Sequence, residues 1–189
     1  MRLPVFLLAL VLAGTPTEAL RQRDAEFRAA FPPGDQGLSE PQRRRVESIV
    51  VRIVDTRQIL ESALAAHWAT LTEAERRRLS EAFERRFRTS TTHHLETMRD
   101  AGIEYLDERP SGDLVIVPTR VTTPDETTEV TYVMREAESG WRIVDIVIDD
   151  VSTVENYRVS FGRIVKREGV DALIQRLERS SEGNPPPNP

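Results

Sequence analysis

Cysteine is absent from the 189-residue chain, which excludes disulfides, thiolate metal sites and a cysteine nucleophile. An excess of positive charge is also absent: the net charge is -5, whereas a general nucleic-acid binder presents a basic face. Only three histidines are present. His93 and His94 are adjacent and diverge by about 100° on a helix, and His67 belongs to another predicted helix. The sequence therefore predicts no metal site and no cofactor.

One long apolar run, Leu3 to Ala13, lies near the N-terminus. It follows the positive charge of Arg2 and precedes a small-residue segment that ends at Ala19, an arrangement typical of a secretory signal peptide. As a helix rising about 1.5 Å per residue, the run would span about 16 Å, or about half of a bilayer core. We therefore expect an exported protein whose leader, residues 1–19, is cleaved after Ala19, rather than a membrane anchor.

Helices are predicted in the first half of the chain from capping residues and apolar stripes. Ser39, Asp55 and Thr72 can each act as an N-cap, and apolar side chains follow them at helical spacing. The third helix extends to about Asp100. We expect it to kink or break within the polar run Thr89 to Thr92, because these residues are poor helix formers.

Strands are predicted in the second half, where β-branched and aromatic residues are separated by turn signals. The predicted strands are Ile103–Glu108, Leu114–Thr122, Thr127–Glu136 and Trp141–Asp149. Their short connections indicate an antiparallel meander, and helices return at Thr153–Glu168 and Asp171–Arg179. The predicted fold class is α+β, with N-terminal helices, a curved antiparallel sheet of about four strands, and C-terminal helices. Helices across the mouth of such a sheet could enclose an apolar cavity.

The main domain is expected to cover residues 39–180. Residues 20–38 are predicted to form a short helix or arm followed by a linker, because Pro32-Pro33-Gly34 interrupts them. The proline-rich tail, residues 181–189, cannot form a core and is expected to be disordered.

The stretch from Trp141 to Arg158 joins the last predicted strand to the following helix. Apolar residues occupy both parities of the strand, so we expect both of its faces to be covered. Asp145 lies in the middle, where a lone buried carboxylate costs several kcal/mol. It could act as a general base, but a structural ion pair with Arg158, or with Arg120, is the favoured interpretation. Ser152 is expected to cap the helix.

Arginine runs occur at residues 43–45, 76–78 and 85–86, opposite predicted apolar stripes. Such runs are typical of solvated helix faces. On an exported protein they could also meet anionic lipid headgroups or an acidic partner.

The order of these local patterns resembles the toluene-tolerance or MlaC-like family of periplasmic phospholipid-binding proteins. The tryptophan-aspartate strand, Val-Ser turn and Asn-Tyr-Arg helix of that family are similar to Trp141–Ser152 and Glu155–Arg158. Upstream, His67-Trp68 and Phe83 match the family's pattern, and downstream Ile164 to Leu177 resembles its closing segment. The resemblance covers roughly residues 41–180 and rests on order and spacing rather than on any single motif.

This resemblance implies a soluble carrier that holds the acyl chains of a phospholipid, or of a related lipid such as a hopanoid, inside the domain. It implies passage across the periplasm between an outer-membrane lipoprotein/porin complex and an inner-membrane ABC transporter with an MCE-domain subunit. No catalytic residue and no nucleic acid are implied. An enclosed cavity would suit the task, since each CH2 exposed to water costs about 0.8 kcal/mol.

The residues expected to line the lipid cavity are apolar or aromatic and come from both helices and strands. They are Trp68, Phe83, Phe87, Val117, Tyr132, Met134, Val147, Val151, Tyr157 and Phe161.

Three departures from the family pattern bear on these expectations. Ala65-Ala66 precede His67 where the family has a glycine, and the polar run Ser90–Thr92 replaces a tyrosine, which bears on the size of the cavity. Asp149-Asp150 replaces a Glu-Gly pair before the Val-Ser turn, which bears on partner docking.

Two other functions stay open at this point. One is an enzyme built on a cone-shaped, NTF2-like sheet, with Asp145 or a histidine as the base. The other is a non-catalytic periplasmic interaction module with a filled core.

Overall fold

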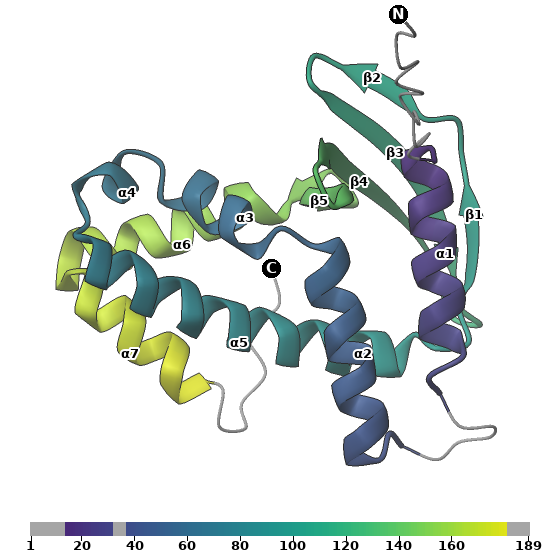
Figure 1. Cartoon of the computed structure of the whole chain (residues 1–189), viewed down its shortest axis with the longest axis horizontal. Helices are drawn as coiled ribbons and strands as arrows, with labels where there is room; N and C mark the ends of the chain where they lie inside the picture. Colours follow the sequence, from purple (N-terminus) through teal and green to yellow (C-terminus); the bar gives the residue numbers. More distant parts are fainter. Residues whose placement is uncertain (1–13, 32–36, 181–189) are drawn as a thin grey trace, which may run out of the picture.

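The computed structural model describes residues 14–31 and 37–180 (Figure 1). The apolar run of the predicted leader, part of the predicted linker and the predicted tail, residues 181–189, lie outside these ranges. The helices are α1 (Pro16–Arg28), α2 (Glu40–Ile53), α3 (Thr56–Leu64), α4 (Ala66–Thr70), α5 (Glu73–Thr97), α6 (Thr153–Glu168) and α7 (Val170–Ser180). The strands are β1 (Gly102–Tyr105), β2 (Arg109–Ser111), β3 (Leu114–Thr122), β4 (Thr127–Ala137), β5 (Gly140–Ile148) and β6 (Val151–Ser152).

The predicted N-caps are confirmed. The Ser39 amide donates to Gln42 Oε1 over 2.9 Å at the start of α2, and Asp55 Oδ1 accepts from the Gln58 amide at the start of α3. Thr72 forms a complete capping box at the start of α5. These side chains satisfy amides that have no partner in the first helical turn, so the caps determine where each helix begins.

The kink expected at Thr89 to Thr92 is wrong. The α5 helix continues through this run for 25 residues, and Thr92 is fully buried. Leu95, one turn further on, contacts both the main core and the smaller cluster that contains Val46 of α2. Helix propensities differ by only tenths of a kcal/mol per residue, so packing of α5 against its neighbours outweighs the weak preference of threonine.

The sheet is antiparallel with strand order β1-β3-β4-β5-β6, and β2 also pairs with β3. The first predicted strand, Ile103–Glu108, is shorter than expected because β1 ends at Tyr105. The short strand β2 was not predicted, and β1 and β2 pair with opposite ends of β3. The Leu106 amide donates to Pro118 O between these two paired segments. The two-residue β6 was not predicted as a strand. The α+β class and the antiparallel meander are confirmed. The described residues form six strands, some of them very short, instead of the four expected.

The helices are divided between two parts of the molecule. Figure 1 shows α1 standing beside β1 and β3, and α6 and α7 on the other side of the view. The long α5 begins beside α7 and runs past α2 toward β1. The main core includes Leu20 of α1, Phe83 of α5, Phe161 of α6 and Val117 of β3. One face of the sheet is therefore covered jointly by α1 and by the group of α3, α5, α6 and α7.

A bulge between Val133 and Met134 changes which residues of β5 face the core. Val133 pairs with Asp145, but Met134 pairs with Ile143, so one residue of β5 is extra. The bulge places Ile143 and Ile146 on the same face although their sequence parity differs. The expectation that both faces of β5 are covered, because its apolar residues occupy both parities, is therefore corrected. The bulge brings Trp141, Ile143, Ile146 and Ile148 to one face.

Candidate functional site

The covered face of the sheet is apolar across its three long strands. One row across this face runs through Val117 of β3, Tyr132 of β4 and Ile146 of β5. The neighbouring row places Met134 between Val115 and Ile143. Val117 and Met134 are fully buried, and the rest of these residues belong to the same core or pack against it. The two rows form the floor of the candidate site.

Four aromatic rings from α5 and α6 form the opposite wall. Phe83 meets Tyr157 edge to face at a centroid distance of 5.3 Å and Phe161 edge to face at 5.9 Å. Tyr157 and Phe161 are stacked at 5.0 Å, and Phe87 lies 5.8 Å from Phe83. Burial raises the pKa of the Tyr157 hydroxyl. Such ring contacts add to the stability from area burial, so this wall is tightly built.

Tyr132 lies at the centre of the floor and has an unusual environment. Its side chain keeps some accessible surface, yet burial raises the pKa of its hydroxyl to about 12, with a smaller contribution from the charge of Asp24 on α1. The Tyr132 side chain is thus largely shielded from water in the space between the sheet and α1.

The α1 side of this space is held largely by polar contacts. The Arg21 guanidinium lies 4.3 Å from the ring centroid of Tyr105, whose pKa is raised mainly by burial. Arg28 pairs with Asp24 at 3.0 Å and donates to Ala101 O at 2.8 Å. The only buried side chains of α1 are Pro16, Leu20 and Phe27.

A hollow opens at the N-terminal end of α1. Its volume is about 380 Å3, and it is lined by Gly14, Thr15, Pro16, Glu108, Arg109, Pro110, Val115 and Trp141. Trp141 Nε1 donates to Gly14 O over 2.7 Å at its edge. Val115 and Trp141 also pack against the main core, so the hollow leads from the surface toward the floor of the site.

The structure brings together eight of the residues predicted to line a cavity. Phe83, Phe87, Val117, Met134 and Phe161 are buried in the main core, and Trp68, Tyr132 and Tyr157 are partly buried against it.

Val147 and Val151 do not join this group. Val147 pairs with Thr131, one position beyond the inward pair of Tyr132 and Ile146, so it faces the other side of the sheet. Val151 is 52% exposed. The bulge in the ladder reverses the face of Val147 expected from sequence parity, whereas Val151 lies in the short edge strand β6.

Asp145 does not pair with Arg158 as predicted. Asp145 Oδ1 accepts from the amides of Ile146, at 2.8 Å, and Val154, at 3.0 Å, and Asp145 Oδ2 accepts from Ser152 Oγ at 2.6 Å. Arg158 pairs instead with Glu155 at 2.6 Å and donates to Ser62 O. Ser152 Oγ accepts from the Glu155 amide, so its predicted role as the N-cap is confirmed. Asp145 and Ser152 thus share the first free amides of α6.

The histidines offer no catalytic or metal arrangement in the part of the chain that the structure describes. Burial, followed by the charge of His93, lowers the pKa of His94. Within residues 14–31 and 37–180, no three histidine or acidic side chains are grouped closely enough to hold a metal ion. No helix in the same ranges combines the length and apolar character needed to span a membrane.

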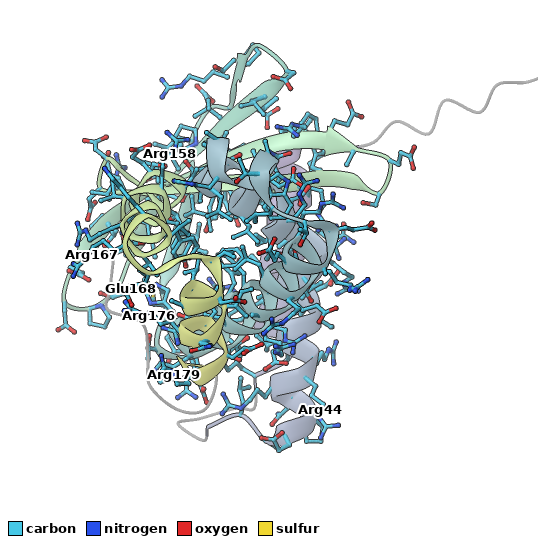
Figure 2. The ribbon with its side chains drawn as sticks, turned by 90° about the vertical axis from the view of Figure 1, so that its left-hand side faces the viewer. Arg44, Arg158, Arg167, Glu168, Arg176 and Arg179 are labelled. Atoms are coloured by element: carbon cyan, nitrogen blue, oxygen red, sulfur yellow. The ribbon has the colours of Figure 1, made fainter. Side chains whose placement is uncertain are left out.

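Of the arginine runs, Arg44, Arg45, Arg77, Arg78 and Arg85 are exposed, whereas Arg43, Arg76 and Arg86 are partly buried. Figure 2 shows Arg44 of α2, and also Arg167 of α6 and Arg176 of α7, pointing away from the interior. Arg176 pairs with Glu168 over 2.6 Å, and Arg88 of α5 pairs with Glu47 of α2 over 3.1 Å. These contacts fit the interpretation of the charged helix faces as solvated surfaces.

Several residues of the site were missed from the sequence. Tyr105, Val115, Trp141 and Ile146 were not predicted to line it, and neither was Leu20 of α1. The periodicity of β3 was a usable signal for Val115, because it shares parity with Val117. No local signal could have placed Leu20 against the sheet, since that contact joins distant parts of the chain.

Comparison with known proteins relates the chain to a protein family and to solved structures. The family model described as MlaC protein matches residues 34–179. Among solved structures, a phospholipid-binding protein from Ralstonia solanacearum, determined in complex with a phospholipid, has a TM-score of 0.76 and 20% sequence identity. The match covers 89% of this chain and 97% of that one. At this identity, the second match bears on the fold alone.

Proposed function

Because the chain belongs to the MlaC family, we propose that it is a periplasmic carrier that holds the acyl chains of a phospholipid, or of a related lipid, between its sheet and its helices. The family match over residues 34–179 carries this proposal. The fold shared with a protein that was crystallised around a phospholipid supports it.

The interior suits acyl chains chemically. The floor formed by Val117, Met134 and Ile143 is apolar, and the aromatic wall faces it across the core. Transfer of each CH2 from water into such surroundings is favourable by about 0.8 kcal/mol. A lipid with two acyl chains can therefore be held without any covalent step, and the proposal requires no catalytic residue.

The hollow beside α1 is the proposed entrance for the lipid. Its volume of about 380 Å3 lies near the lower end of the range of roughly 300–1,000 Å3 found for small-molecule pockets. Two acyl chains need more space than this. The adjoining wall must then move, and α1 is suited to do so because polar contacts, which water can replace, hold most of its length.

The proposed partners follow from the family. We propose that the loaded protein exchanges lipid with an inner-membrane ABC transporter that has an MCE-domain subunit, and with an outer-membrane lipoprotein/porin complex. The outward charged faces of α5, α6 and α7 are available for such contacts.

An enzyme with Asp145 as general base has less support. Both carboxylate oxygens of Asp145 already accept hydrogen bonds at the start of α6. If the purified protein holds no lipid and its interior stays closed, the alternative function is that of a non-catalytic interaction module with a filled core.

The test uses two neighbouring residues of β5 that face opposite sides of the sheet. The full chain, exported in a Gram-negative host, is purified and its organic extract is analysed by mass spectrometry. We expect about one lipid per protein. Ile146→Trp, which fills the interior, should remove most of this lipid. Val147→Trp adds the same bulk on the other face and should leave the lipid content unchanged.

Absence of lipid from the wild-type protein, under conditions that load a known carrier, would contradict the proposal. Equal lipid content in the two tryptophan variants would place the lipid elsewhere on the molecule.

A further inference from the structure

The predicted cleavage point after Ala19 lies inside a helix. The α1 helix begins at Pro16 and continues without interruption to Arg28. A cut after Ala19 would remove its first turn and leave Leu20, which is only 6% exposed and belongs to the main core, as the first residue. The predicted end of the leader therefore conflicts with the way the domain is built.

The first turn of α1 carries a complete start signal. Thr15 Oγ1 accepts from the Glu18 amide at 3.2 Å, and Glu18 Oε2 accepts from the Thr15 amide at 2.7 Å. Pro16 occupies the first helical position, where its fixed φ suits the helix and its missing N–H is not needed. A capping box of this kind satisfies two otherwise free amides and marks the start of a helix.

The same turn is also joined to the sheet. Thr17 donates to Glu108 through both its amide, at 3.1 Å, and its hydroxyl. Trp141 Nε1 donates to Gly14 O at 2.7 Å. These bonds connect residues separated by 91 and 127 positions in the sequence, so they form only in the folded domain. Residues discarded with a leader would have no part in them.

We propose that the leader is removed by hydrolysis of the amide bond between Ala13 and Gly14, so that the mature chain begins at Gly14. The inference rests on the proposed export of the protein. A signal peptidase is the class of enzyme required. One water is consumed, Ala13 leaves with the new carboxylate, and Gly14 acquires the new α-ammonium group.

The small residue needed before the cut is supplied by Ala13 as well as by Ala19, the residue predicted from the sequence. The fold distinguishes them. Cleavage at Leu20 would place an ammonium group in the core, where an unpaired charge is costly, and at the positive end of the shortened helix. Cleavage at Gly14 places the ammonium group beside the Glu18 carboxylate, which already accepts from the next amide along the chain.

This processing also affects the proposed entrance. Gly14, Thr15 and Pro16 line the hollow at the end of α1, so a chain that begins at Gly14 keeps this wall and adds one positive charge to it. A chain that begins at Leu20 would lack the wall altogether.

The test is the intact mass of the protein exported from the full-length gene product and purified from the periplasm. A mass that corresponds to residues 14–189 is expected. A first residue of Leu20, or retention of Met1, would overturn the proposal. Ala13→Leu should abolish the 14–189 species, whereas the matched change Ala19→Leu should leave it unchanged; the opposite pattern would also overturn the proposal.

A second measurement tests the structural basis independently. Chains that begin at Gly14 and at Leu20 are compared by thermal unfolding, and the shorter chain should melt lower by about 4 °C or more, given the loss of a cap and of two contacts to the sheet. Equal melting temperatures would show that the first turn is not part of the stable domain. Loss of lipid binding alone would contradict the proposed carrier function but would not change either readout.

Discussion

The same face of the sheet is covered in two different ways. On one side, α3, α5, α6 and α7 contribute fully buried apolar residues such as Ile59, Leu60 and Phe83. On the other side, α1 contributes Leu20 to the core on the sheet, while its Phe27 packs in a separate cluster with Val46 of α2. Polar contacts hold much of the rest of α1. The first covering is a continuous core, whereas the second resembles a surface contact.

This difference indicates which part of a carrier can open. Exposure of buried apolar surface costs about 25 cal/mol per Å2, so separation of the α5 and α6 side from the sheet is expensive. A polar contact exchanged for water costs much less, since a typical hydrogen bond contributes only about 1 kcal/mol net. We therefore expect α1 to move while the other covering stays in place.

The largest effect is expected from the aromatic wall. Phe83 is 1% exposed and contacts three other rings, so Phe83→Ala should lower the free energy of unfolding by about 3–5 kcal/mol. Denaturant unfolding followed by circular dichroism measures it. Val159→Ala is the control, because Val159 is 53% exposed on α6 and its truncation should have little effect. Similar losses for both variants would contradict the assignment of the wall as core.

The next effect concerns the start of α6. Asp145→Ala removes the acceptor for the Val154 amide and for Ser152 Oγ, and should cost about 2–3 kcal/mol. Arg158→Ala should cost less than about 1 kcal/mol, because its partner Glu155 is half exposed. Measurement of both unfolding free energies separates the cap from the ion pair that the sequence suggested. Equal losses of unfolding free energy in the two variants would favour the ion pair of Asp145 with Arg158 that the sequence suggested.

Alkaline pH should lower the free energy of unfolding because the Tyr132 hydroxyl is buried. An ordinary tyrosine has a pKa near 10, and burial raises the pKa of Tyr132 to about 12. The unfolded chain therefore loses this proton first, so the stability contributed by the neutral hydroxyl is complete below about pH 10 and is lost as the pH rises from about 10 to about 12. Tyr132→Phe should flatten this part of the curve of unfolding free energy against pH. An unchanged slope would show that Tyr132 is well solvated.

Hydrogen exchange should distinguish the two coverings directly. Amides in the middle of α1 should exchange at least about tenfold faster than those around Phe83 in α5, because local opening of α1 exposes less apolar surface. Mass spectrometry of peptides from the exchanged protein gives both rates in one sample. Equal protection of α1 and α5 would show that they open together and would argue against α1 as the moving wall.

The smallest effect is expected at the end of α3. Ala65 has φ 45° and ψ -117°, a conformation that glycine adopts readily and alanine does not. Ala65→Gly should therefore raise the stability of the domain by up to about 1 kcal/mol. A thermal melt is sufficient to detect it. A loss of stability would indicate that the alanine methyl group makes a contact that offsets the strain.

The sequence by itself determined the local elements. Ser39, Asp55, Thr72 and Ser152 begin helices because their side chains bond to amides only two or three residues away. The long strands followed from patterns of the same short range, and the family followed from the order and spacing of such patterns along the chain.

Only the tertiary structure decided how these elements meet. The bulge opposite Met134 turns Val147 away from the interior and Ile146 into it, and α5 continues without a break through Thr92. The position of α1 depends on contacts such as that of Trp141 with Gly14, which are 127 positions apart in the sequence. Local preferences amount to tenths of a kcal/mol per residue, so they determine the elements but are overridden wherever distant residues bury surface together.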